Sequence, residues 1–234
     1  MSDRRKRKKM SGCLYGIGVG PGDPELMTLK ACRLIRECDV IAIPSEEIET
    51  CVAYEIAKGA VPELDQKEVM CISMPMTKDK EILERCHESA VSAICGELDK
   101  GKRIGFLTLG DPTVYSTYIY VHKRIGERGY GTEIVNGIPS FCAAAARLNC
   151  GLVEGADQLH IIPASYGVEE ALGLPGVKVL MKAGRTMKSV KEKVAEGNCR
   201  FQMVENCGMR DERVYDSVDD VPEQASYYSL MIVK

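Results

Sequence analysis

The sequence lacks any apolar run close to the roughly 18 residues that a membrane-spanning helix needs. Its amino terminus is also without the apolar stretch of a secretory signal peptide. These absences favour a cytoplasmic protein. With 234 residues, 45% of them apolar, the chain is long enough to bury a sizeable core in one large domain or two compact ones.

Metal-binding patterns are missing as well. The chain has eleven cysteines but no Cys-x-x-Cys pair, and an odd number scattered through apolar segments is typical of reduced cysteines that pack as small hydrophobic residues. The three histidines, His87, His122 and His160, are too far apart in the sequence to indicate a ligand set. We therefore expect neither a disulfide framework nor a structural metal.

Charge is distributed unevenly along the chain. The formal net charge is −3, but residues 1–11 carry six basic residues and one acid, so this segment has a charge of +5 and the rest of the chain −8. Because a run of like charges repels itself, we expect residues 1–12 to form a disordered basic tail. Such a tail could bind nucleic acid or anionic lipid, or help to attract an acidic substrate. We expect neither a membrane nor nucleic acid to be the main partner.

Apolar strand-like segments alternate with amphipathic helix-like segments in the first half of the chain, and the second half is richer in strands. The alternation is typical of a mostly parallel sheet covered by helices. We predict an α/β protein with two domains, residues 13–122 and 123–234, and a soft boundary where Gly126, Gly129 and Gly131 mark a bend. The expected strands are 14–19, 40–43, 104–109, 133–136, 159–163, 177–182, 200–205, 212–216 and 227–233, and the expected helices are 24–38, 78–100, one from about residue 113, and 140–148.

Residues 16–24 form a glycine-rich turn between a strand and a helix. The turn fails the Gly-x-Gly-x-x-Gly spacing of a dinucleotide site, and no Gly-Lys-Ser/Thr of a phosphate loop follows it. Asp23 is predicted to cap the next helix, with Pro24 at the first helical position, and its negative charge disfavours a phosphate. The turn therefore indicates a ligand that approaches the backbone closely.

A second junction, at residues 109–113, repeats this arrangement. A glycine closes a buried strand, Asp111 stands at the cap position and Pro112 opens a helix. One such junction alone is typical of ordinary helix capping. Two of them indicate a ligand site, because open parallel sheets bind ligands outside the carboxyl ends of their strands. Asp111 could receive a cation while backbone N–H groups hold a carboxylate, and an amino acid carries both groups.

These motifs together resemble the tetrapyrrole methylases, which are S-adenosylmethionine-dependent methyltransferases built from two α/β domains with the cofactor in the cleft between them. The resemblance covers residues 14–234. It rests on Gly-x-Gly-Pro-Gly-Asp-Pro-x-Leu-x-Thr-x-Lys-Ala at 18–31, the Gly-Asp-Pro junction, and Gly-Ile-Pro-Ser-Phe at 137–141. Residues 108–118 and 137–146 look like the branch that methylates carbon 20 of precorrin-2 or its cobalt form. At the first of these stretches, the enzyme that makes precorrin-2 usually has Gly-Gly-Asp-Pro followed by Phe-Ile-Phe-Gly-Arg. This chain departs from that pattern, which disfavours the earlier methylation step.

The resemblance also implies a homodimer and a role for each motif. Gly110 and Asp111 would contact the methionine end of S-adenosylmethionine, and residues 182–184 would flank its adenine or ribose. The residues implied in the cofactor pocket are Pro21, Gly110, Asp111, Val114, Ser140, Phe141, Lys182 and Ala183. On the substrate side stand Gly20, Gly22 and Asp23, and Arg147 and Arg185 are candidate clamps for the tetrapyrrole carboxylates. Lys182 could equally be a solvated strand-end lysine, and either arginine a surface residue.

The cofactor's sulfonium is already a strong electrophile, so an enzyme of this kind mainly aligns donor and acceptor and excludes water. It needs no Ser-His-Asp or Cys-His arrangement, and the sequence displays none. A base must remove a proton from the methylated carbon or its conjugated partner, but the sequence does not indicate which residue acts as this base. The alternatives are a methylase of another tetrapyrrole carbon, a diphthine-type methylase acting on a protein, and, from a different class, a non-catalytic nucleotide-binding module.

Overall fold

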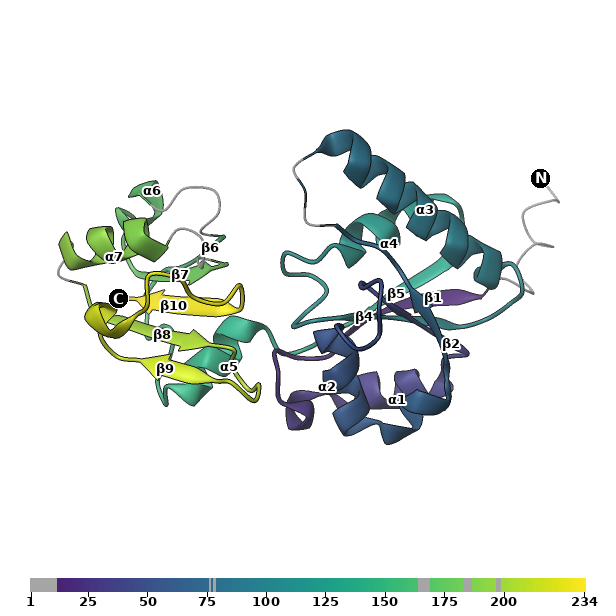
Figure 1. Cartoon of the computed structure of the whole chain (residues 1–234), viewed down its shortest axis with the longest axis horizontal. Helices are drawn as coiled ribbons and strands as arrows, with labels where there is room; N and C mark the ends of the chain where they lie inside the picture. Colours follow the sequence, from purple (N-terminus) through teal and green to yellow (C-terminus); the bar gives the residue numbers. More distant parts are fainter. Residues whose placement is uncertain (1–11, 76, 78, 164–168, 183–186, 197–198) are drawn as a thin grey trace. The chain divides into compact units, whose positions relative to one another are not determined.

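The chain forms two compact units, Met1–Ile138 and Pro139–Lys234, each built around its own five-stranded sheet (Figure 1). The computed structural model describes residues 12–234 except 76, 78, 164–168, 183–186 and 197–198. The first sheet is parallel throughout and the second is mixed. The predicted α/β fold with two different sheets is thus confirmed.

The first sheet has the strand order β3-β2-β4-β1-β5. Its strands are β1 (Cys13–Gly18), β2 (Val40–Ile43), β3 (Glu68–Cys71), β4 (Ile104–Thr108) and β5 (Gly131–Val135). β2 and β4 are buried along their whole length. Strands of a parallel sheet that helices cover on both faces read as continuous apolar runs, which is why these two were recognisable in the sequence.

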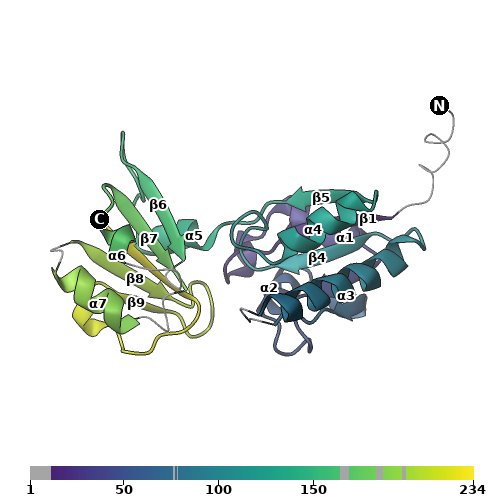
Figure 2. The same cartoon turned by 90° about the horizontal axis from the view of Figure 1, so that it is seen from above.

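Helices cover both faces of this sheet (Figure 2). They are η1 (Pro24–Leu26), α1 (Leu29–Glu37), α2 (Val52–Ala60), η2 (Pro62–Gln66), α3 (Lys80–Leu98) and α4 (Tyr118–Glu127). On one face α1 and α2 pack over a cluster that includes Ile17 and Leu107. On the other, α3 and α4 pack over Leu14 and Phe106, and Tyr118 of α4 belongs to the same cluster. Successive strand residues therefore contribute to opposite cores.

Two helices begin later than the sequence suggests. In place of one helix over residues 24–38, the short η1 is capped by Asp23, and α1 begins only after Thr28. Thr28 Oγ1 accepts a hydrogen bond from the Ala31 N–H at 3.1 Å, which is the geometry of a helix N-cap. The helix expected from about residue 113 begins at Tyr118. The helix-capping role predicted for Asp111 is therefore wrong, because no helix follows it directly.

The division between the units falls after β5. This strand pairs in parallel with β1, and Ile17 lies opposite Val135, so β5 completes the first sheet. The expected boundary after residue 122 would assign β5 to the second domain, but its pairing keeps it in the first unit. Gly12, the last residue of the expected tail, is buried, and its N–H donates to the Leu98 carbonyl at 3.0 Å. The rest of that segment, residues 1–11, lies outside the described residues.

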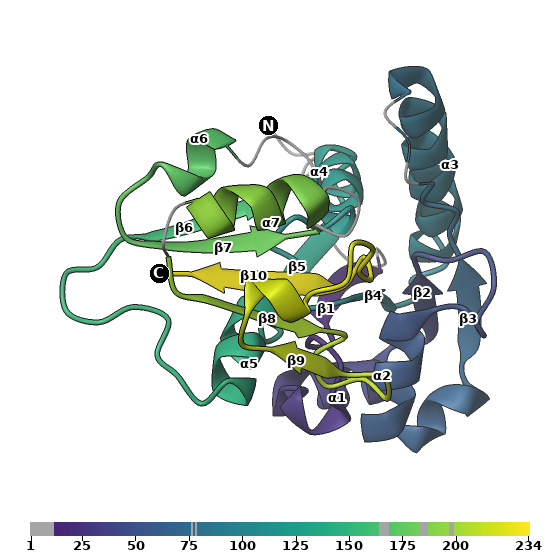
Figure 3. The same cartoon turned by 60° about the vertical axis from the view of Figure 1, so that its left-hand side comes forward.

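The second sheet has the order β6-β7-β10-β8-β9, with β6 and β7 parallel and the other pairs antiparallel. Its elements are α5 (Ser140–Arg147), β6 (Leu159–Pro163), α6 (Glu169–Leu172), β7 (Val177–Met181), α7 (Met187–Glu196), β8 (Phe201–Glu205), β9 (Arg213–Tyr215), η4 (Val218–Asp220) and β10 (Ser229–Val233). Helix α7 packs on the sheet, and its Val190 lies in one cluster with Leu180 of β7 and Met231 of β10 (Figure 3). Helix α5 contacts β8 and β10.

No helix in the described part of the chain is long and apolar enough to cross a membrane. In those same residues, no group of three or more His, Cys, Asp and Glu side chains is placed to hold a metal ion. The eleven cysteines are free thiols. Burial raises the pKa of Cys38 to about 12, so this thiol packs as a small uncharged group.

Candidate functional site

Three loops meet at the carboxyl edge of the first sheet, namely those that follow β1, β4 and β5. The first two are joined by a short antiparallel bridge between Gly20 and Gly110. The Gly110 N–H donates to the Gly20 carbonyl at 2.8 Å, and the Gly20 N–H donates back to the Gly110 carbonyl at 3.2 Å. The two Gly-Asp-Pro junctions, which are far apart in the sequence, therefore become neighbours in the fold.

Glycine is required where these loops touch. Gly110 has a φ of +69°, in the left-handed region that side chains disfavour. A Cβ on Gly137 would lie 2.1 Å from the Gly110 carbonyl oxygen, and a Cβ on Gly18 would lie 2.5 Å from the Gly137 nitrogen. Because these neighbours are backbone atoms, no side chain can rotate to make room. The motif segments thus pack backbone against backbone.

Asp111 holds the loops together with its carboxylate. Oδ1 accepts hydrogen bonds from the Thr113 N–H at 2.7 Å and from the Thr113 hydroxyl. Oδ2 accepts from Asn136 Nδ2 and from the Gly137 N–H, both at 3.1 Å. Burial raises the pKa of Asp111, but the hydrogen bonds from these three residues outweigh that effect and hold the pKa below its usual value. Asp111 is an ionised organiser of the loops, with donors of the chain itself on both oxygens.

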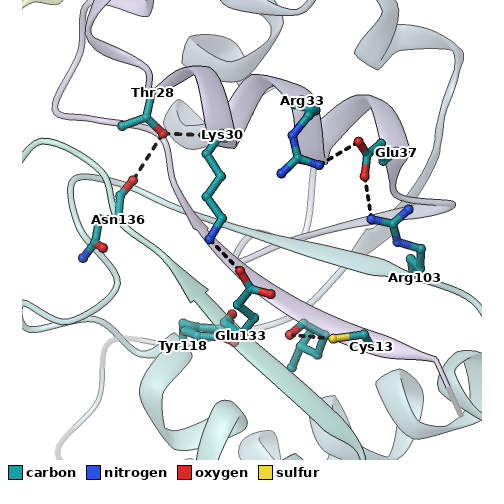
Figure 4. A network of polar contacts seen from close by, with 11 residues as sticks. Cys13, Thr28, Lys30, Arg33, Glu37, Arg103, Tyr118, Glu133 and Asn136 are labelled. Carbon is teal, nitrogen blue, oxygen red and sulfur yellow. Dashed lines mark hydrogen bonds and ion pairs between the residues drawn. The ribbon is translucent and has the colours of Figure 1, made fainter.

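Asn136 extends this network to the start of α1. Its backbone carbonyl accepts a hydrogen bond from Thr28 Oγ1 at 3.5 Å (Figure 4). Thr28 is the N-cap of α1, and the same helix is tied to β5 by an ion pair of 2.6 Å between Lys30 and Glu133. Each of the three sequence motifs therefore contributes a residue to one connected set of contacts: Thr28 from the first, Asp111 from the second and Gly137 from the third.

The site residues predicted in the first unit all lie on these loops. Pro21 and Gly22 are buried in the loop after β1, and Asp23 is half-buried, its Oδ1 accepting from the Glu25 N–H at 2.8 Å. Val114 is half-buried, and its N–H donates to the Asp111 carbonyl at 3.1 Å in a turn. The fold thus brings together the residues predicted at 20–23, 110, 111 and 114.

The second unit carries the other predicted residues. Phe141 is buried and Ser140 half-buried in the first turn of α5. Lys182 directly follows β7 with a φ of +61°, which non-glycine residues rarely adopt, and its ammonium lies 5.6 Å from the centre of the Tyr227 ring. Lys182 therefore has a backbone conformation that is uncommon at the end of a strand.

Arg147, the first of the two candidate arginines, is the last residue of α5. Arg147 forms an ion pair with Glu212, which raises the pKa of Arg147. Much of its charge is therefore balanced within the second unit, and a substrate carboxylate would have to share the guanidinium with Glu212. Arg185, like the predicted cofactor residue Ala183, lies outside the described residues.

Sequence reasoning overlooked a buried hydroxyl at the carboxyl edge of the first sheet. Thr108 ends β4 beside Gly18, is only 7% exposed, and its Oγ1 has no hydrogen-bond partner among the described residues. The backbone carbonyl of Thr108, in contrast, has a partner, since it accepts a hydrogen bond from the Val19 N–H at 2.9 Å. The signal that could have found it is a hydroxyl residue that closes an otherwise apolar strand just before Gly-Asp-Pro.

Residues 13–221 match the family described as Tetrapyrrole (Corrin/Porphyrin) Methylases. The chain belongs to this family. Its relatives include a probable cobalt-precorrin-2 C(20)-methyltransferase of Methanocaldococcus jannaschii, 37% identical over 94% of this chain and 95% of that protein. The cobalt-precorrin-2 C(20)-methyltransferase of Salmonella typhimurium is 32% identical over 84% of each chain. A solved structure of a cobalt precorrin-4 methyltransferase shares the fold, with a TM-score of 0.74 over 94% of each chain and 19% identity.

Membership of the tetrapyrrole methylases confirms the resemblance that the glycine motifs indicated. It also favours a methyltransferase over the nucleotide-binding module considered as an alternative. In this tetrapyrrole methylase, the segments that carry the resemblance are the ones that meet at the edge of the first sheet.

Proposed function

We propose that this tetrapyrrole methylase transfers a methyl group from S-adenosylmethionine to carbon 20 of precorrin-2 or cobalt-precorrin-2, in the synthesis of cobalamin. The observation that carries the proposal is the convergence of three motif loops, joined by the Gly20–Gly110 bridge and by the Asp111 carboxylate, in a chain that matches two proteins named for this reaction. Residues 108–118, the stretch that looks like the carbon-20 branch, form the end of β4, the loop that contains Asp111 and the first residue of α4.

The carboxyl edge of the first sheet fits the amino-acid part of the cofactor. Open parallel sheets bind ligands at this edge, and at Gly110, where an added Cβ would meet only the Ile138 oxygen at 4.0 Å among the described residues, the backbone carries no side chain. When bound, S-adenosylmethionine supplies an electrophilic methyl group on its sulfonium. The protein then has to hold the donor and the acceptor carbon in line and exclude water. We assign Pro21, Val114 and the Gly110–Asp111 turn to the cofactor in this role.

We assign the predicted residues of the second unit to the other parts of the cofactor and to the tetrapyrrole substrate. Ser140 and Phe141 would contact the cofactor from the start of α5, and Lys182 and Ala183 would flank its adenine or ribose. Arg147 and Arg185 would bind carboxylates of the tetrapyrrole, because a guanidinium matches the geometry of a carboxylate. We further propose a homodimer that acts in the cytoplasm; analytical ultracentrifugation should give twice the mass of one chain.

A methylation assay with precorrin-2 and cobalt-precorrin-2 tests the reaction. We expect S-adenosylmethionine to methylate at least one of them, and the new methyl group, located by NMR, to lie on carbon 20. A reaction without the enzyme and one without S-adenosylmethionine are the controls. A methyl group on another ring carbon would move the enzyme to a different step, and no turnover of either compound would refute the proposal.

Calorimetry separates a methylase from a nucleotide-binding module. We expect S-adenosylhomocysteine to bind and a nicotinamide dinucleotide to show no heat of binding, because the glycine turn lacks the dinucleotide spacing. Tight binding of the dinucleotide without binding of S-adenosylhomocysteine would favour the module.

A further inference from the structure

Thr108 ends β4 at the carboxyl edge of the first sheet, and its neighbour on β1, Gly18, has no side chain. Side chains alternate along a strand, so Thr108 points to the same face of β4 as Phe106, which packs beneath α3 and α4. The neighbours of these two residues on β1 are both glycines, because Gly16 pairs with Phe106 and Gly18 pairs with Thr108.

The spaces over the two glycines are filled differently. The ring of Tyr118 covers Gly16, where an added Cβ would lie 2.0 Å from the ring carbon Cε1. Over Gly18 the nearest atoms are backbone, the Gly137 nitrogen at 2.5 Å and the Gly110 oxygen at 2.7 Å from the added Cβ. Thr108 is therefore next to the place where the loops after β4 and β5 meet over Gly18.

The threonine hydroxyl is an unfavourable choice for the apoprotein. The other residues of β4 are isoleucine, glycine, phenylalanine and leucine, and all are buried. A valine has the same branched shape and would fill this position without removing a hydroxyl from water. A buried hydroxyl without a partner destabilises a fold. The cost is offset if a ligand supplies the missing partner.

We propose that Thr108 Oγ1 hydrogen-bonds the amino-acid end of the methyl donor. The inference rests on the proposed function and deepens it, because it assigns a contact to a residue outside the Gly-Asp-Pro motif. Thr108 precedes Leu109, Gly110 and Asp111, the turn assigned to the methionine end. Both Asp111 oxygens already accept two hydrogen bonds from the chain, so the hydroxyl of Thr108 is the polar side-chain atom here that still lacks a partner among the described residues.

Two variants and two ligands test this contact. Thr108→Val removes the hydroxyl and keeps the shape, and Thr108→Ser keeps the hydroxyl. S-Adenosylhomocysteine carries the amino-acid end, whereas 5′-methylthioadenosine has the same nucleoside and sulfur without it. By calorimetry, Thr108→Val should bind S-adenosylhomocysteine about tenfold or more weakly than the parent, the effect of losing a hydrogen bond to a charged group. Its affinity for 5′-methylthioadenosine should be unchanged, and Thr108→Ser should bind both ligands as the parent does.

Thermal melting of the ligand-free proteins completes the test. Thr108→Val should melt no lower than the parent, because the threonine hydroxyl has no partner among the described residues to lose. A lower melting temperature would show an internal partner and overturn the inference. Equal weakening of both ligands, or undiminished binding of S-adenosylhomocysteine by Thr108→Val, would overturn it as well while leaving the proposed function intact. Failure of the parent itself to bind S-adenosylhomocysteine would refute both.

Discussion

Replacement of Asp111 by asparagine should destabilise the first unit, although asparagine and aspartate cap helices about equally well. The reason is that Asp111 caps no helix. Its two carboxylate oxygens accept four hydrogen bonds from Thr113, Asn136 and Gly137, whereas an amide has only one acceptor oxygen. One oxygen position must therefore become an NH₂ group that faces two donors.

The magnitude follows from the bonds that are lost. If the new amide keeps its oxygen toward Thr113, the bonds to Asn136 and Gly137 disappear. Asn136 can turn its own amide and recover one of them, but the Gly137 N–H is buried and keeps no acceptor at this position. Hydrogen bonds to charged groups contribute roughly 1.5–3 kcal/mol each, so the free energy of unfolding should fall by about 3 kcal/mol.

Urea unfolding followed by circular dichroism measures this loss, and the chain supplies a matched control. Asp23 stands in the other Gly-Asp-Pro junction, is half-buried, and its side chain caps η1 by accepting from the Glu25 N–H. Asp23→Asn should therefore change the free energy of unfolding by only a few tenths of a kcal/mol, on the order of ordinary cap exchanges. The same chemical change at two copies of one motif should give very different results.

The pH dependence gives a second signature of Asp111→Asn. The folded-state pKa of Asp111 is lowered, so its ionisation stabilises the fold above the unfolded-state pKa of about 3.9, and this contribution is lost as pH falls through the folded-state pKa. The stability difference between parent and variant should shrink in acid. Equal stability of the two proteins at neutral pH, or a loss at Asp23→Asn as large as at Asp111→Asn, would refute the reasoning.

Three further predictions concern other parts of the chain. Gly137→Ala should lower the free energy of unfolding by about 3 kcal/mol or more, because its Cβ meets the backbone of Gly110. Gly96→Ala in α3 should raise the free energy of unfolding by about 1 kcal/mol, because among the described residues its Cβ meets no atom within 4 Å beyond the adjacent helix backbone; urea unfolding compares the two. His87 is buried, and desolvation first and the charge of Arg124 second lower its pKa. As pH falls through about 6.5, the unfolded chain therefore protonates His87 at a higher pH than the folded chain does, and the free energy of unfolding should decline. His87→Phe should reduce this fall of the melting temperature with pH in melting curves recorded from pH 7 to pH 5. Removal of residues 1–11 should change neither the melting temperature nor the affinity for S-adenosylhomocysteine, because the segment has no apolar face to bury; a drop of several degrees would contradict this.

Several elements could be predicted because one local pattern determines them. β2 and β4 are short apolar runs that are buried on both faces, and α3 shows a stripe of apolar residues at helical spacing. Elements with a weaker pattern were not anticipated. β3 is an edge strand of four residues that are all at least partly exposed, and α2 is a nine-residue helix without a side-chain cap.

The sequence by itself determined the two sheet types, the glycine turns and the family to which the motifs belong, because these depend on residues that are close together in the chain. Only the tertiary structure decided what the motifs do to one another. Asp111 and Gly137 are separated by 26 positions, and no periodicity or propensity indicates that a carboxylate after β4 will bind a backbone N–H after β5. The parallel order β4-β1-β5 brings those strand ends to one edge, so the carboxylate that looks like a helix cap links the loops after β4 and β5. The sequence shows a hydroxyl residue at the end of an apolar strand, but only the folded sheet shows that the Thr108 hydroxyl is buried without a partner among the described residues.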